Sequence, residues 1–157
     1  MKIKDVKFKN LPKKGYCGHC DDMVDFHIEH FKNRLHSVKG VEVKSDEFVA
    51  ICNKCGNELW VEAIEEVDDK LVFDAYKKEV GLLTSQEIKD IRTKRRMSQK
   101  ELAKFLSIGE KDITRYENGS IQTRAVDLMI RMVDNDETYF AMTNLVNKQK
   151  LVMSKAH

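Results

Sequence analysis

Two pairs of cysteines, each separated by two residues, constrain the first third of this 157-residue chain more than any other feature. The pairs are Cys17–Cys20 and Cys52–Cys55. Two intervening residues let both thiolates of a tight turn reach the same ion, and two such turns supply the four sulfur ligands of a closed tetrahedral zinc site. We therefore expect one structural Zn²⁺ bound by these four cysteines.

The 31 residues between the two cysteine pairs contain three short stretches typical of β-strands, at residues 24–31, 38–43 and 48–51. They are interrupted near Asn33, Gly40 and Ser45–Asp46. We predict a three-stranded antiparallel meander between the cysteine pairs.

An enzymatic alternative starts from His27-Ile-Glu29 followed by Cys52-x-x-Cys55, which superficially matches a zinc-deaminase signature. Ile51 stands where that signature has proline, and the first cysteine pair would have no role. Four thiolates also leave no position for a reactive water. We expect no enzyme; a zinc hydrolase or deaminase, with three protein ligands and a bound water, is the alternative.

Residues 98–119 have the pattern of two short helices joined by a tight turn. Ser98 and Glu101 form a capping box, and Gly109 in the turn can adopt backbone angles that other residues resist. The second helix is expected from about Glu110, with apolar residues on one face only, and to end at Gly119. A short helix supporting a second helix with a polar outer face is the helix-turn-helix arrangement that enters a DNA major groove.

Ser98-Gln99-x-Glu101-Leu102-Ala103 followed by Tyr116-Glu117-Asn118-Gly119 resembles the Cro/repressor (Xre-type) helix-turn-helix family, over roughly residues 83–133. From the residues alone, an ordinary helical hairpin is the alternative. A second capping box, Thr84 with Glu87, is expected to begin the preceding helix.

The chain as a whole is predicted to be α+β, with a zinc-bound antiparallel β domain followed by an all-α domain of about five helices. The expected divisions are residues 1–66 with a basic N-terminal arm, a helical linker at 67–82, and a DNA-binding and dimerisation domain at 83–157. Apolar residues at 138–153 suggest a last amphipathic helix. That helix would serve either a dimer contact or simple packing.

The combination of the four cysteines with Gly81-Leu-Leu-Thr, Glu87-Ile-x-x-Ile-Arg and Ile113-Thr-Arg-Tyr-Glu-Asn-Gly resembles the MqsA (YgiT-type) antitoxin family. The resemblance implies that the zinc domain binds a toxin protein. It also implies that the C-terminal domain forms a homodimer, binds double-stranded DNA at a palindromic operator and represses its own operon. The basic first 16 residues and the extended C-terminal helix depart from the family pattern.

In the helix-turn-helix frame, the outward side of the second helix would read bases and neighbouring polar residues would contact phosphates. Arg115 would form two hydrogen bonds with a guanine edge, unless it is held in a surface ion pair with Asp112 or Glu117. The residues expected to read bases are Glu110, Lys111, Thr114 and Arg115, and those expected at phosphates are Gln99, Arg95, Asn118 and Arg124.

The formal net charge is only +2, but the charge is unevenly distributed. Residues 84–124 contain ten Lys/Arg against six Asp/Glu, whereas residues 57–79 contain three Lys against eight Asp/Glu. This distribution suggests different partners for the two parts of the chain. The absence of a long apolar run or signal peptide leads us to expect a cytoplasmic protein without membrane contact. The alternative function is a stand-alone regulator of a phage or mobile element, with no toxin partner.

Overall fold

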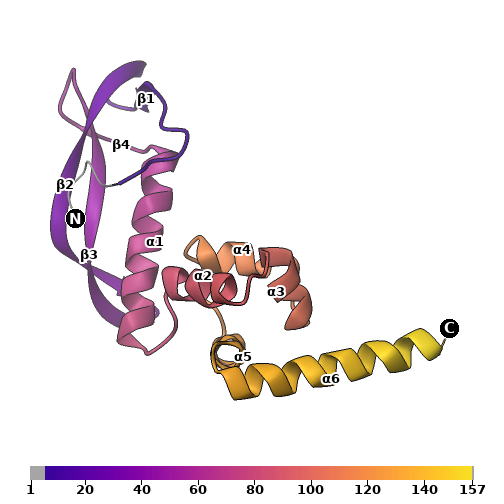
Figure 1. Ribbon diagram of the computed structural model, residues 1–157. Coiled ribbons are helices and arrows are strands. Elements are labelled where there is room, and N and C mark those ends of the chain that lie inside the picture. The colour runs from indigo at the N-terminus through magenta and orange to yellow at the C-terminus, as the bar shows by residue number, and fades with distance from the viewer. Residues whose placement is uncertain (1–5, 157) are drawn as a thin grey trace. The chain divides into compact units, whose positions relative to one another are not determined.

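The computed structural model describes residues 6–156, and the chain divides between Val80 and Gly81 into a sheet unit and a helical unit. The sheet unit has an antiparallel four-stranded sheet and one helix, and the helical unit has five helices (Figure 1). This confirms the predicted α+β fold class. None of the helices in residues 6–156 is long and apolar enough to span a membrane.

The sheet is dominated by one long hairpin. Strand β2 (Asp22–Val38) pairs with β3 (Val41–Cys52), and the short strands β1 (Lys14–Cys17) and β4 (Glu58–Leu59) flank them in the order β1-β2-β3-β4. The predicted three-stranded meander is therefore wrong. Asn33 has φ of 54° at a register shift between Phe31 and Arg34, so it marks a β-bulge within a continuing strand. Between the two cysteine pairs, only the tight turn at Gly40 reverses the chain.

Helix α1 (Glu62–Glu79) packs on β3 and completes the core of the sheet unit. It begins five residues before the expected helical linker at 67–82 and belongs to the sheet unit, because Val61 and Ile64 are buried in that core. Phe48 lies at the centre of the core, with the ring of Phe8 meeting it edge-on at 5.5 Å. The expected basic arm thus joins the core from Val6 onward, and its residues 1–5 lie outside the described residues.

The helical unit contains α2 (Ser85–Lys94), α3 (Gln99–Phe105), α4 (Asp112–Glu117), α5 (Arg124–Asp134) and α6 (Asp136–Lys155). Both predicted capping boxes, at the starts of α2 and α3, are confirmed. Helices α2 to α5 surround one apolar core, in which the fully buried side chains are Ile88, Leu102, Ala103, Ile113, Ile130 and Val133.

The turn between α3 and α4 differs from the expectation in one respect. Ser107, with φ of 55°, is the residue in the left-handed region, whereas Gly109 has no positive φ. Glycine suits position 109 because it has no side chain. The Gly109 N–H donates to Asp112 Oδ2 at 3.1 Å, and an added Cβ would lie only 2.9 Å from that oxygen. This contact fixes the start of α4 at Asp112, two residues later than predicted.

A buried carboxylate ties α5 to the segment before α2. Asp127 Oδ1 accepts hydrogen bonds from the N–H of Leu83 at 2.7 Å and from the Gln122 amide at 3.0 Å. Burial alone would raise the pKa of Asp127, but hydrogen bonds from Arg131, Leu83 and Gln122 outweigh it and lower the pKa. The ionised carboxylate therefore holds the segment before α2 against the start of α5.

Candidate metal centre and nucleic-acid interface

The two cysteine turns lie at the same end of the sheet and converge. Cys17 ends β1 and Cys52 ends β3, and both side chains are buried. The residue after each second cysteine, Asp21 or Gly56, has a positive φ that closes its turn. All four Sγ atoms, of Cys17, Cys20, Cys52 and Cys55, lie within 4.8 Å of one another.

The distances in this cluster fit a tetrahedral metal ion. Four sulfurs bound to one zinc at about 2.3 Å lie about 3.8 Å apart. The Cys17–Cys55 and Cys20–Cys52 sulfur pairs are 3.6 Å and 4.0 Å apart. The Lys54 N–H donates to Cys52 Sγ at 3.4 Å and the Asn57 amide donates to Cys55 Sγ at 3.3 Å, as expected of thiolates.

The pKa values of the cysteine thiols also favour a bound cation. Hydrogen bonds from the backbone and side chain of Asn57 lower the pKa of the Cys55 thiol to about 6. A hydrogen bond to Cys55 raises the pKa of the Cys20 thiol to about 12. The four sulfurs by themselves therefore do not all ionise near neutral pH, whereas a divalent cation at their centre would stabilise every thiolate.

His27, the histidine that a deaminase site would need, has another partner, and so has the neighbouring His30. His27 Nδ1 lies 2.6 Å from Asn53 Oδ1, and His30 Nε2 lies 2.8 Å from Asp46 Oδ2 while its ring stacks on Phe48. Within the described residues, the four cysteines form the one cluster able to bind a metal. The geometry therefore favours a closed thiolate shell over a catalytic site with an open position.

The helix-turn-helix pair is held together by a polar network that the sequence analysis missed. Arg92 on α2 donates to both oxygens of Glu117 on α4, at 2.6 Å and 2.9 Å, and to the carbonyl of Met97 at 2.8 Å. The Gln99 amide donates to Glu117 Oε2 at 2.8 Å, and Thr114 Oγ1 donates to Gln99 Oε1 at 2.7 Å. The network connects the ends of α2, α3 and α4 and so fixes the orientation of α4.

Glu117 is the centre of that network. Its side chain is 5% exposed. Burial would raise its pKa, but the hydrogen bonds from Arg92 and Gln99 outweigh it and keep the pKa below its usual range. The burial of Glu117 could have been expected from the sequence. In a helix that ends at Glu117, this residue lies one turn after the buried Ile113 and therefore on the same, inward side.

Three of the residues expected at DNA are therefore already engaged within the protein. Gln99 and Thr114 bond to each other in the network. Arg95 lies across the ends of α5 and α6, where it donates to the Val133 and Asp134 carbonyls and to Asp136, and its guanidinium stacks 4.2 Å above the ring of Tyr139. We infer that Arg95 has a structural role.

The other expected DNA residues are exposed. Arg115 is 67% exposed and forms, at 3.5 Å, the surface ion pair with Asp112 that was the alternative to base reading. Glu110 forms an exposed ion pair with Lys100 at 3.2 Å. Such pairs are worth about 0–1 kcal/mol, so DNA phosphates and bases can displace them. The exposed set is Glu110, Lys111, Arg115, Asn118 and Arg124.

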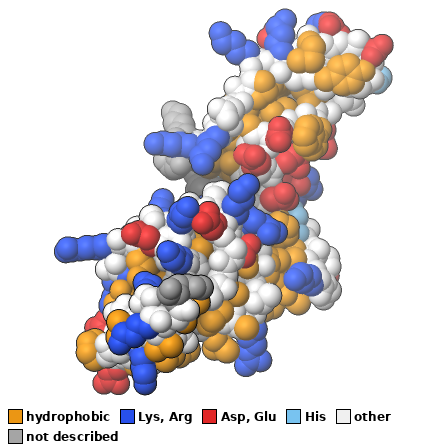
Figure 2. Space-filling model, turned by 90° about the vertical axis from the view of Figure 1, so that its right-hand side faces the viewer, with side chains coloured by type: hydrophobic (Ala, Val, Ile, Leu, Met, Phe, Trp, Pro, Cys, Tyr) orange, Lys and Arg blue, Asp and Glu red, His pale blue; other side chains and the backbone are white. Residues whose placement is uncertain are grey.

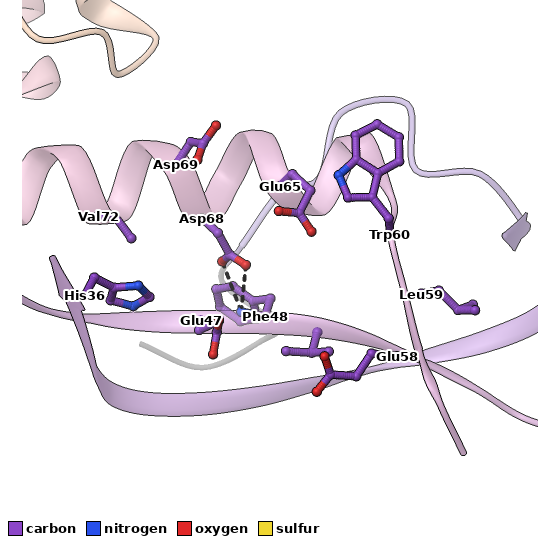
Figure 3. A pocket seen from close by; sticks show the side chains of 11 residues that line it. His36, Glu47, Phe48, Glu58, Leu59, Trp60, Glu65, Asp68, Asp69 and Val72 are labelled. Carbon is purple, nitrogen blue, oxygen red and sulfur yellow. Dashed lines mark hydrogen bonds between the residues drawn. The ribbon is translucent and has the colours of Figure 1, made fainter. Parts of the chain in front are cut away.

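The sheet unit offers a different surface, an acidic groove of about 360 Å³ between α1 and the sheet, lined mainly by β3 and β4. Figure 2 shows acidic side chains gathered beside hydrophobic ones on this unit. In Figure 3 the Asp68 carboxylate points at β3, where it accepts two hydrogen bonds from the N–H of Phe48, and Trp60 stands at one end of the groove. The acidic residues that line the groove are Glu47, Glu58, Glu65, Asp68 and Asp69.

The carboxylates in the groove repel one another, which makes each of them harder to ionise. Burial, together with the smaller repulsion from the neighbouring Glu47, Glu65 and Asp69, raises the pKa of Asp68 to about 7 against the hydrogen bonds from the Phe48 N–H. Trp60 is 71% exposed, which is unusual for so large an apolar side chain. A partner with a cationic surface would relieve the repulsion and cover the indole.

Comparison with known protein families gives a match over most of the chain. The model of MqsA, the antitoxin component of a bacterial toxin-antitoxin system, matches residues 13–138. That range includes the four cysteines, the acidic groove and the complete helix-turn-helix pair, and it ends at the start of α6. No match was found among curated proteins.

We predict that Glu117→Gln destabilises the helical unit by about 3 kcal/mol, because it leaves the largely buried Arg92 guanidinium without a counter-charge. Urea unfolding followed by circular dichroism would measure the loss. Glu110→Gln is the matched control, since its carboxylate is 69% exposed, and should change stability by less than about 0.5 kcal/mol. Equal stability of the two variants would contradict the structural role assigned to Glu117.

Proposed function

The chain belongs to the MqsA family of antitoxins, and on this premise we propose that it is a cytoplasmic, non-catalytic repressor that also neutralises a toxin protein. In this proposal the helical unit binds a palindromic operator as a homodimer, and the sheet unit binds Zn²⁺ and the toxin. The observation that carries the proposal is the combination, in one chain of this family, of a four-cysteine cluster and a rigidly held α3–α4 pair with a cationic outer face.

The outer face of α4 supports the DNA-binding part of the proposal. Lys111, at the N-cap of α4, and Arg115, one turn further along, are both exposed on this face. The beginning of a recognition helix is the part that meets base edges. The buried side of α4 is fixed by Ile113 and Glu117, so the helix presents these cations in one orientation. Asn118 and Arg124, exposed at the next turn and at the start of α5, are proposed to contact phosphates.

We assign the bound Thr114 and Gln99 side chains a supporting part in this interface. Their mutual hydrogen bond connects the first turn of α3 with the middle of α4. Both side chains are only partly buried. Arg95 is left out of the proposed phosphate contacts because its guanidinium is engaged at the α5–α6 junction.

We predict that Arg115→Ala weakens sequence-specific binding to DNA from upstream of the gene. One bidentate contact with guanine is worth about 1–3 kcal/mol, which corresponds to a loss of roughly 5- to 150-fold in affinity. Gel-shift titrations at fixed salt would measure it. Lys104→Ala, on helix α3, serves as the control for loss of one positive charge. An unchanged preference for the operator over random DNA in Arg115→Ala would contradict the assignment.

The proposed metal is Zn²⁺ with a structural role. The four thiolates would hold the ion at one end of the sheet, where it would join the ends of β1 and β3 to the turns that follow them. A sheet unit with one helix and a small apolar core gains much of its stability from such a link.

We predict that Cys17→Ser lowers zinc content from one ion per chain to below about a tenth and unfolds the sheet unit, because structural zinc binding is coupled to folding. Metal analysis and hydrogen exchange would show the effect, with protection lost in residues 14–79 and retained in the helical unit. His19→Ala, inside the same turn, should keep the metal. Full zinc content in Cys17→Ser would remove this residue from the ligand set.

Toxin binding is proposed for the sheet unit at the acidic groove. Its exposed tryptophan and its repelling carboxylates suit a partner that brings cationic side chains and an apolar contact. The charge of the groove also makes it a poor surface for DNA, so the two proposed partners would use separate units of the chain.

We predict that Trp60→Ala weakens capture of the toxin encoded beside this gene by about 10-fold or more, as expected of a buried aromatic anchor. Co-purification and calorimetry would test this, with Leu35→Ala, another exposed apolar side chain of the same unit, as control. Operator binding should be unaffected in both variants. If no neighbouring gene product is toxic or binds the chain, the alternative of a stand-alone regulator replaces the antitoxin proposal.

A further inference from the structure

The cysteine cluster has a buried side and an open side. Cys17 and Cys52 are only 1% and 2% exposed, because they belong to the core of the sheet unit. Cys55 lies in the turn that follows β3 and is the most exposed of the four. The next residue is Gly56, and apart from its chain neighbours no atom lies within 4 Å of the place where a Cβ would stand. A small solute can therefore reach the sulfur of Cys55 from water.

This accessibility matters because of the state of the sulfurs. Cysteines bind zinc as thiolates, and the thiolate is also the form of cysteine that peroxides oxidise. In the metal-loaded cluster all four sulfurs share this thiolate character. Exposure is then what distinguishes them, and it selects Cys55 as the first to react.

A second sulfur lies close enough to complete the reaction. Cys17 Sγ is 3.6 Å from Cys55 Sγ, and Cys20 Sγ is 4.0 Å from Cys52 Sγ. Both of these pairs join the first cysteine turn to the second. Redox-sensing cysteines are typically exposed and lie beside another cysteine that captures the first oxidation product. Cys55 and Cys17 stand in this relation.

We propose that the cysteine cluster is an oxidation site, at which a hydroperoxide reacts first with Cys55 and Cys17 then forms a disulfide with it. In the first step the Cys55 sulfur attacks the outer oxygen of the hydroperoxide. The S–O bond forms, the O–O bond breaks, and the leaving oxygen takes a proton from water, so that the products are a sulfenic acid and an alcohol, or water when the oxidant is hydrogen peroxide.

The second step closes the disulfide. The Cys17 sulfur attacks the Cys55 sulfur, the S–S bond forms, the S–O bond breaks and hydroxide leaves. Over both steps two thiolates lose two electrons, and the hydroperoxide gains them.

The disulfide removes two of the four metal ligands. Cys20 and Cys52 alone do not make a closed tetrahedral shell, so the site no longer holds zinc. The new bond still joins the two turns that the metal would join, so reduction in the presence of zinc should restore the site. No cysteine follows residue 55, so the reaction leaves the helical unit unchanged. The inference goes beyond the proposed function, because it concerns the cysteine cluster alone.

The test uses the full-length, zinc-loaded protein with hydrogen peroxide as the probe. Zinc release is followed with a coloured chelator, and disulfides are mapped by mass spectrometry of the unreduced digest. We expect release of one zinc ion per chain, with Cys17–Cys55 as the first disulfide, and recovery on addition of dithiothreitol and zinc. Retention of zinc under a large excess of peroxide, or a first disulfide within one cysteine turn, would overturn the inference.

Two variants that can keep a complete set of ligands test the role of Cys55. Zinc also accepts three cysteines and one histidine, so Cys55→His and Cys20→His each preserve four donors. Cys55→His should slow zinc release by about tenfold or more, because it removes the accessible thiolate. Cys20→His is the matched control and should release zinc at about the wild-type rate, since Cys55 and Cys17 remain. Equal slowing in both variants would contradict the proposed order of reaction.

A measurement on the wild-type protein decides the question if a variant fails to bind metal. Dimedone, which labels sulfenic acids, is added with a limiting amount of peroxide. The label should appear on Cys55 before any other cysteine, and first labelling of Cys17, Cys20 or Cys52 would overturn the inference. None of these measurements involves DNA or a toxin, so failure of the proposed function would leave their outcome unchanged.

Discussion

The convergence of four thiolates at one end of the sheet is the constraint on which the sheet unit depends. The cysteines lie at the ends of β1 and β3 and in the turns that follow, so one tetrahedral ion would join segments 35 residues apart in sequence. A link of this kind removes much of the conformational freedom of the unfolded chain. It allows a unit with few fully buried large side chains to hold a long hairpin and one helix in place.

The helical unit solves a comparable problem without a metal. Its three short helices α2, α3 and α4 are connected by a bidentate ion pair between Arg92 and Glu117, to which Gln99 and Thr114 add hydrogen bonds. A buried pair of this type adds little net stability, because both charges lose water, but it tolerates only one geometry. It serves the orientation of α4, whose exposed side is the proposed reading surface.

The two units therefore present chemically opposite surfaces. The groove of the sheet unit collects carboxylates until burial and repulsion raise the pKa of Asp68 to about 7, while the outer face of α4 presents Lys111 and Arg115 to solvent. A cationic protein and an anionic duplex would each find one complementary surface. In the proposed antitoxin this separation lets a single chain bind its toxin and its operator through different residues.

The sequence by itself determined the features that depend on local spacing. Two residues between cysteines define a metal turn, and Ser98 with Glu101 defines a helix start, because both act over a single turn of chain. The same locality made the family recognisable and allowed Arg115 to be placed on an exposed face. The sequence left the role of Asn33 open, because a polar residue with positive φ suits both a turn and a β-bulge. The pairing of β2 with β3 on both sides of Asn33 shows that it forms a bulge.

Tertiary structure alone decided which polar side chains are free. Arg92, Arg95 and Arg115 look equivalent in the sequence, yet the first meets Glu117 across 25 residues, the second caps the α5–α6 junction, and the third stays exposed. Likewise, helix α1 belongs to the sheet unit because Ile64 reaches the core around Phe48. Such contacts join residues distant in sequence, and their energies depend on burial, which no local pattern specifies.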